Sequence, residues 1–196
     1  MRTLGVSGFR LPRKLLRMII LITLVYSIGS QHTWSNIRSF ESGLINGLTV
    51  PYLAPMIVGI EEWINSPPLS LDQLKGKVVL ISFWTFACIN CIHTLPILTK
   101  LDQTYRNKGL VIIGIHTPEF PFERSLENIK IAVKEHNIHY AIALDNDFKT
   151  WSNFDNRYWP AQYLVDRQGK VVYVHFGEGD YKITESNINY LLRPAP

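Results

Sequence analysis

Cysteine is nearly absent from this 196-residue chain, which carries only two, Cys88 and Cys91. A structural zinc site needs four ligands, and without a second cysteine pair the sequence does not fit that kind of site. Repeats and low-complexity tracts are lacking too. A composition of 46% hydrophobic and 18% charged residues is not that of a disordered protein. The sequence therefore predicts one domain with a buried core and terminal extensions.

Acidic residues are absent before Glu41, whereas five lysines and arginines lie within the first 17 positions. The formal charge of +4 depends on these five residues, and without them the remainder carries a charge of −1. Nucleic-acid binding requires a basic face on the folded domain itself. We therefore expect no nucleic-acid partner.

The run that follows the basic cluster is shorter than the about 20 apolar residues of a membrane span. It extends over Met18–Gly29, and such a run after positive charge is typical of a signal peptide or an uncut signal anchor. We expect residues 1–30 to form that segment, residues 31–55 a linker or pre-domain segment, and residues 56–196 the folded domain. Because Lys and Arg stay on the cytoplasmic side, the domain is expected in the periplasm or another extracytoplasmic compartment, either exported or anchored through N-terminal membrane contact.

Strands and helices alternate along the remainder of the chain. Apolar, β-branched runs predict strands, and amphipathic stretches with capping residues predict helices. The expected strands cover residues 56–60, 78–84, 110–116, 140–144, 162–165 and 171–176, and the expected helices cover residues 88–107, 125–136 and 183–192. This order predicts an α/β fold with a mixed central sheet, a terminal hairpin and helices on both faces, which is the layout of the thioredoxin fold.

The cysteine pair stands directly between an apolar strand and a helix, as Cys88-Ile89-Asn90-Cys91. A Cys-x-x-Cys at this place predicts a redox-active dithiol, because the free N–H groups of a helix start stabilise a thiolate. We expect Cys88 to attack a substrate disulfide and Cys91, one turn further in, to resolve the mixed disulfide. An inert disulfide would close so short a loop that it would add little stability.

The two residues between the cysteines bring no positive charge to the pair. Neither Ile89 nor Asn90 is therefore expected to acidify the thiols strongly. We predict a mildly to strongly reducing couple rather than a strong oxidant.

The chain resembles the extracytoplasmic thioredoxin-like proteins of the TlpA/ResA type, above all the thioredoxin-like domain of DipZ-type proteins, which are associated with cytochrome c biogenesis. The resemblance runs from about residue 54 to residue 181. It is carried by GIEEWINS (59–66), SFWTFACINC (82–91), HTPEFPFE (116–123), ALDND (143–147), NRYWPAQYLVD (156–166) and FGEGDY (176–181).

The resemblance assigns roles to residues outside the cysteine pair. It implies that Pro160 is a cis-proline that faces the dithiol and presents its backbone to the substrate. Trp84, which precedes the motif, and Trp159, directly before Pro160, are expected to line a substrate groove, to belong to the core, or to do both. The resemblance also implies that Glu119 accepts a proton from, or tunes, the inner cysteine. Ser82 stands where thioredoxins carry a buried aspartate and cannot take up a proton at neutral pH, which leaves Glu119 as the better candidate base.

The sequence thus predicts a thiol–disulfide oxidoreductase without cofactor or resident metal. Exported proteins are the expected substrates; the resemblance implies that apocytochrome c is one of them and that a membrane dithiol carrier donates the electrons. A copper-delivery protein of the Sco type is an alternative, with His116 or His139 as a distal ligand, although the cysteine spacing is narrower than in that family. A thiol peroxidase is another alternative, because Thr85 precedes Cys88 by three residues, although the match to that family is partial.

Overall fold

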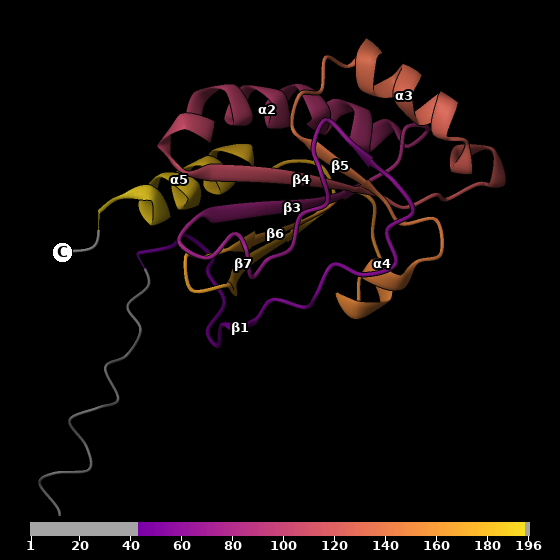
Figure 1. Ribbon diagram of the computed structural model, residues 1–196. Helices are drawn as coiled ribbons and strands as arrows, with labels where there is room; N and C mark the ends of the chain where they lie inside the picture. The colour runs from indigo at the N-terminus through magenta and orange to yellow at the C-terminus, as the bar shows by residue number, and fades with distance from the viewer. Residues whose placement is uncertain (1–42, 195–196) are drawn as a thin grey trace, which may run out of the picture. The chain divides into compact units, whose positions relative to one another are not determined.

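The computed structural model describes residues 43–194. The signal peptide or anchor expected over residues 1–30 lies outside the described residues. A seven-stranded sheet has the order β1-β7-β6-β3-β4-β5-β2 and forms the centre of the domain (Figure 1). Its strands are β1 (Tyr52–Leu53), β2 (Trp63–Ile64), β3 (Val78–Trp84), β4 (Leu110–His116), β5 (Ala141–Leu144), β6 (Ala161–Val165) and β7 (Lys170–Phe176).

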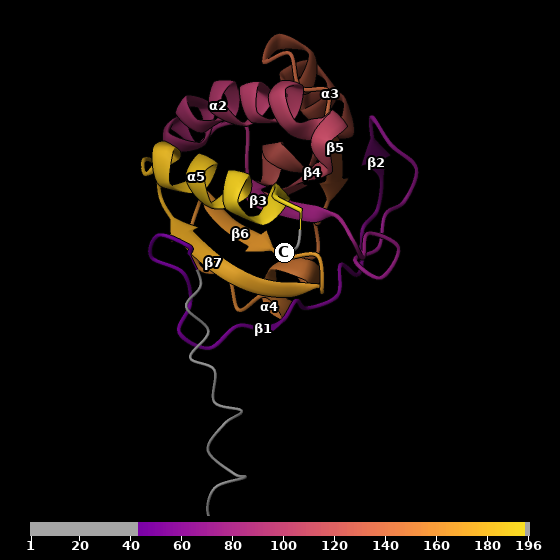
Figure 2. The ribbon, with the colours of Figure 1, turned by 90° about the vertical axis from the view of Figure 1, so that its left-hand side faces the viewer.

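Helices cover both faces of this sheet, as predicted. They are α2 (Ile89–Tyr105), α3 (Leu126–Glu135), α4 (Lys149–Asn153) and α5 (Tyr181–Leu192), with two short 3₁₀ helices, η1 (Arg106–Lys108) and η2 (Pro121–Arg124). Figure 2 shows α2, α3 and α5 above the sheet and α4 below it. The core is correspondingly divided into two clusters, of which the lower one is completed by apolar residues of the segment before β3.

Strand β3 is the central strand, and all seven of its residues are buried. It pairs in parallel with β4 and antiparallel with β6. A strand buried on both faces reads as the continuous apolar run that the sequence displays. Because of these directions, the carboxyl ends of β3 and β4 and the amino end of β6 meet at one edge of the sheet. Segments that are distant in sequence therefore come together at this edge.

The long elements predicted from the sequence are confirmed, whereas the short ones are not. The strand expected over residues 56–60 is wrong: this segment is irregular, and two-residue strands lie on either side of it as β1 and β2. Its backbone bonds to α4 instead of to a strand, since the Val58 N–H donates to Thr150 Oγ1 at 2.9 Å. Helix α4 was not predicted at all.

The segment before β1 packs on the domain. The Leu48 N–H donates to the carbonyl of Val172 at 2.7 Å, and Ile45 exchanges two hydrogen bonds with the side chain of Asn187 in α5. The domain boundary expected at residue 56 stays a prediction. Within residues 43–194, every helix is too short or too polar to cross a bilayer.

The turn of the β6–β7 hairpin lies at the ends of the strands that are opposite to the dithiol. Gly169 has a φ of 82° in its turn, a conformation that favours glycine. The Arg167 guanidinium donates to the carbonyl of Leu192 at 2.9 Å, and the Ala54 N–H donates to the carbonyl of Gly169 at 2.9 Å. The end of α5 and the residue directly after β1 are therefore both hydrogen-bonded to this hairpin.

Candidate active site

The two cysteines lie where β3 gives way to α2. Cys88 is the N-cap of α2, and its Sγ accepts a hydrogen bond from the Cys91 N–H at 3.2 Å. Both thiols are free; Cys88 is partly exposed, whereas Cys91 is fully buried. A thiolate at Cys88 would face the unpaired N–H groups of the first helical turn, which stabilise negative charge. The arrangement thus has one accessible and one sequestered sulfur on the same turn.

Burial separates the chemistry of the two thiols. It raises the pKa of the Cys91 thiol, and the neighbouring Cys88 and the charge of Glu119 raise it further, against a lowering contribution from the backbone of Thr85. Cys91 is therefore held as a neutral thiol at physiological pH. To act as a nucleophile, it must lose its proton at the moment of reaction.

Pro160 lies directly before β6, at the end of the sheet where β3 leads into the dithiol loop. The Trp159–Pro160 peptide bond is cis, as the resemblance implied. In the ladder between β3 and β6, Phe83 is paired with Ala161, which places Pro160 at the end of β3 where the Cys88 loop begins. The Pro160 carbonyl accepts the Gly177 N–H at 2.8 Å, so that the loop after β7 is tied to the same place.

The two tryptophans expected to contact substrate differ in exposure. Trp84 is 1% exposed and belongs to the core, because it is the last residue of the central strand and points into the α2 face. It offers no surface that a substrate can touch. Trp159 is half-buried; its indole N–H donates to the carbonyl of Thr117 at 2.9 Å and its ring packs on Trp151. Trp159 thus joins the cis-proline loop to the loop after β4.

The acidic side chain that hydrogen-bonds to the dithiol loop is that of Glu123, not that of Glu119. The Glu119 side chain is exposed on the loop after β4. Glu123, in η2, is fully buried and accepts hydrogen bonds from the Thr85 hydroxyl and from the Ala87 N–H at 3.0 Å. The sequence does carry a signal for it: Pro121 at the first helical position with a glutamate at the third resembles a capping box, but Phe120 stands where Ser or Thr would mark one.

A buried histidine lies behind the same loop. The His116 ring stacks on Phe86 at 5.6 Å and meets Trp84 edge to face at 5.3 Å, and its Nε2 lies 3.4 Å from Thr85 Oγ1. Burial lowers the pKa of His116 to about 4, although the nearby Glu123 charge opposes this shift. The Thr85 hydroxyl is occupied by Glu123, so it is not directed at Cys88 as a peroxidase mechanism would need.

We expect His116 to make the domain less stable as the pH falls from about 6.5 to about 4. In this window the unfolded chain binds a proton at the histidine while the folded domain does not, so that lowering the pH favours unfolding. The loss amounts to about 3 kcal/mol. Urea unfolding at several pH values would measure it: the gap in stability between the wild type and His116→Gln should shrink toward pH 4. A constant gap would contradict a neutral buried ring.

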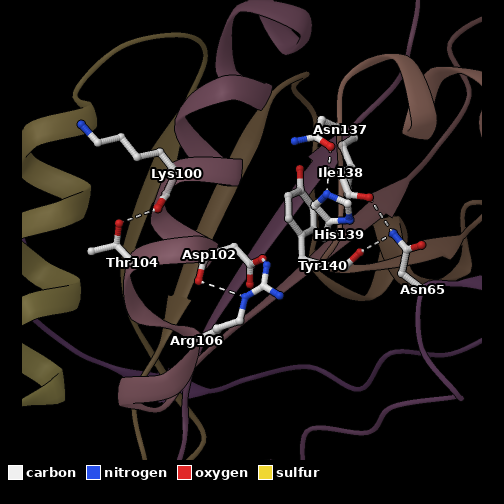
Figure 3. A network of polar contacts seen from close by, with 9 residues as sticks. All are labelled: Asn65, Lys100, Asp102, Thr104, Arg106, Asn137, Ile138, His139 and Tyr140. Carbon is white, nitrogen blue, oxygen red and sulfur yellow. Dashed lines mark hydrogen bonds and ion pairs between the residues drawn. The ribbon is translucent and has the colours of Figure 1, made fainter.

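A second polar cluster lies far from the dithiol, on the outer part of α2 (Figure 3). Asp102 and Arg106 form an ion pair one turn apart, and the Asn65 amide donates to the carbonyls of Ile138 and Tyr140 at 2.9 and 3.1 Å. Asp102 is 14 residues beyond Cys88, or about 21 Å along the helix axis. Within residues 43–194, no group of three or more His, Cys, Asp and Glu side chains is placed to hold a metal ion.

Comparison with known proteins places this site in a family context. The Redoxin family model matches residues 65–192. Protein DipZ of Mycobacterium tuberculosis is 47% identical over 145 residues, which are 72% of this chain and 21% of DipZ, so the chain spans about a fifth of that relative. Thiol-disulfide oxidoreductase ResA of Bacillus cereus is 27% identical over 166 residues, covering 85% of this chain and 89% of ResA.

A solved structure shows which fold this chain shares. The solution structure of a thioredoxin-like protein in the oxidized form matches with a TM-score of 0.67 and 28% sequence identity, covering 72% of this chain and 95% of that chain. The thioredoxin layout predicted from the order of strands and helices is therefore confirmed, and so is the resemblance to ResA-like and DipZ-type proteins.

Proposed function

The chain belongs to the Redoxin family, and from that premise we propose that it is a thiol–disulfide oxidoreductase of the thioredoxin-like type, with Cys88 as its attacking nucleophile and Cys91 as its resolving thiol. The observation that carries this proposal is the placement of the two sulfurs. Cys88 is partly exposed at the N-cap of α2, and Cys91 is buried three residues along the same turn. An accessible sulfur can reach a protein substrate, whereas a buried one can react only with its neighbour.

The cycle consists of two thiol–disulfide exchanges. The Cys88 thiolate attacks one sulfur of a substrate disulfide, and the other substrate sulfur leaves as a thiolate and takes up a proton. Cys91 then gives up its proton and attacks Cys88 Sγ, which forms the Cys88–Cys91 disulfide and releases the second substrate sulfur. The substrate gains two electrons and two protons. Both electrons come from the dithiol, whereas one proton comes from Cys91 and the other from the solvent that took up the proton of Cys88.

Glu119 is proposed as the acceptor of the Cys91 proton. Burial raises the pKa of Cys91, so this thiol needs a base during the second exchange. The charge of Glu119 is the smallest of the causes that raise the pKa of Cys91, and it supports an electrostatic interaction between the two groups. Its exposed position allows the proton to pass on to solvent.

A protein substrate suits the surface around Cys88. Ile89, Phe120 and Phe122 are 60%, 48% and 55% exposed, although such side chains are usually buried. Phe122 contacts Phe86, two residues before Cys88, in an edge-to-face arrangement at 6.0 Å. We propose that an extended substrate segment lies between this aromatic side and Trp159–Pro160, with its backbone pairing beside Pro160.

We further propose that the protein is a reductant of exported proteins, with apocytochrome c as one substrate. In this proposal the domain works in the periplasm or another extracytoplasmic compartment, attached or exported through residues 1–30, and a membrane dithiol carrier restores its thiols. Support comes from the basic and apolar pattern of the N-terminus and from the similarity to DipZ. The absence of positive charge between the cysteines favours the reducing direction.

Trapping the mixed disulfide tests this function. A tagged Cys91→Ala chain, expressed in its own cells, should accumulate bound to exported proteins through Cys88, and dithiothreitol should release them. Proteins with a Cys-x-x-Cys-His haem site should be among those identified. In the chain with both cysteines, Glu119→Gln should lengthen the lifetime of the mixed disulfide.

The double variant Cys88→Ala, Cys91→Ala is the matched control and should trap nothing. Equal capture by the single and double variants would contradict the proposed function. An unchanged lifetime in Glu119→Gln would remove only the role of Glu119.

A further inference from the structure

Glu123 occupies a place in the fold that the exchange chemistry described above does not use. Its carboxylate is fully buried, and four donors converge on its two oxygens. Oε1 accepts the Thr85 hydroxyl and the Ala87 N–H, whereas Oε2 accepts the N–H groups of Glu119 and Phe120 at 2.6 and 2.8 Å. Four donors suit an ionised carboxylate, which is an acceptor only.

These four hydrogen bonds join two separate loops. Thr85 and Ala87 belong to the segment between β3 and α2, and Glu119 and Phe120 belong to the segment after β4. A backbone bond from the Thr117 N–H to the Trp84 carbonyl, at 3.1 Å, holds the same two segments together at their origin. Glu123 is therefore a buried bridge just beyond the carboxyl ends of the paired strands β3 and β4, where the sheet itself no longer fixes the backbone.

The bridge reaches the residue directly before the reactive cysteine. Cys88 has φ and ψ of −82° and 114°, the extended conformation of an N-cap, and its sulfur accepts the Cys91 N–H. A shift of Ala87 would turn the Cys88 backbone and move the sulfur away from the helix start. The carboxylate also brings a negative charge near Cys88, which by itself would oppose the thiolate. The two effects act on reactivity in opposite directions, so they can be told apart.

We propose that Glu123 is a positioning residue for Cys88, which holds the loop of Thr85 to Ala87 in the geometry that places the Cys88 sulfur on the N-terminus of α2. This inference deepens the proposed function and rests on it, since Cys88 is taken as the attacking sulfur. Positioning outweighs the repulsion of the charge. Removing the carboxylate therefore slows Cys88 instead of activating it.

The test measures the first exchange alone, in full-length chains that carry Cys91→Ala. The reduced protein is mixed with 5,5′-dithiobis(2-nitrobenzoate), and the release of thionitrobenzoate is followed across a range of pH up to the plateau at which Cys88 is fully ionised. Glu123→Gln removes the charge and two acceptor sites. Glu123→Asp keeps the charge but shortens the reach. Glu127→Gln, which changes an exposed carboxylate four residues further along, in the first turn of α3, is the matched control.

A positioning role predicts that Glu123→Gln and Glu123→Asp both lower the plateau rate, by about tenfold for the loss of one well-aligned contact. Glu127→Gln should stay within about twofold of the parent rate. Two other results would overturn the proposal. If charge dominates, Glu123→Gln reaches its plateau at a lower pH without any loss of plateau rate, and Glu123→Asp reacts like the parent. If Glu123 serves stability alone, the melting temperature falls but the plateau rate stays the same.

A second variant covers the case in which Glu123→Gln does not fold. Thr85→Val keeps the shape of a buried side chain and removes one of the four donors, so it should lower the plateau rate by a smaller factor. Its effect should be less than additive with that of Glu123→Asp, because the two changes act on one hydrogen-bonded unit. This assay uses a small disulfide and no protein substrate. It can therefore contradict the role of Glu123 while the trapping experiment supports the proposed function, and it can support that role while trapping contradicts the function.

Discussion

Replacing Cys88 with alanine is expected to abolish turnover of protein disulfides, with a loss of at least about a thousandfold in the rate of insulin reduction driven by dithiothreitol. The physical reason is that the remaining sulfur cannot substitute. Cys91 is fully buried, and burial raises its pKa, so it is neither accessible nor ionised at neutral pH. The residual rate should equal that of dithiothreitol without protein.

The matched control is Cys91→Ala, which retains the accessible sulfur. This variant should react once with a disulfide at nearly the parent rate and then stop as a mixed disulfide, because the intramolecular second exchange is lost. Retention of more than about a tenth of the turnover in Cys88→Ala would show that the accessible sulfur is not the nucleophile.

Replacing Phe83 with alanine is expected to produce the largest loss of stability, about 3–5 kcal/mol. Phe83 is fully buried in the central strand, where its ring meets Trp151, Phe154 and Tyr163 edge to face at 5.5–5.7 Å. Truncation would leave a cavity among these closely packed rings, and the rings cannot move together to fill it.

Denaturant unfolding followed by tryptophan fluorescence would measure this loss. Phe176→Ala is the matched control, because Phe176 is 50% exposed at the end of β7 and should cost about 1 kcal/mol or less. Similar losses in the two variants would contradict the assignment of Phe83 to the structural centre of the lower core.

The sequence predicts those parts of the fold whose pattern is local and repeated. β3 and β4 are seven-residue strands that are apolar apart from Ser82 in β3 and Gly114 and His116 in β4, and their predicted limits agree with the structure. Helix α4 has five residues and begins after Phe148, which offers no side-chain cap. Its start is fixed by Asp145, which accepts the N–H groups of Thr150 and Trp151 from five and six residues before them, and not from the N-cap position at which a helix signal is sought in a sequence. Helix α4 therefore leaves little trace in local sequence.

The candidate site divides in the same way. Cys88 and Cys91 could be placed on the first helical turn because their spacing and the preceding strand specify it. The buried bridge of Glu123 could not, since its donors come from positions 85, 87, 119 and 120 and meet only through the parallel pairing of β3 with β4. The exposure of Glu119 and the burial of Trp84 likewise depend on how loops close over the sheet edge rather than on residue type.

The fastening of α5 and of the Ala54 backbone at the β6–β7 hairpin determines how this domain can be combined with others. The hairpin turn lies at the strand ends far from Cys88. A segment attached to the domain at that end therefore does not pass over the surface around Cys88. A tether or a fused domain can be added at that end of the sheet while Cys88 Sγ stays accessible to a large partner. The matching segment is 21% of the much longer DipZ, and a domain whose attachment points lie away from its reactive sulfur suits such a place within a long polypeptide.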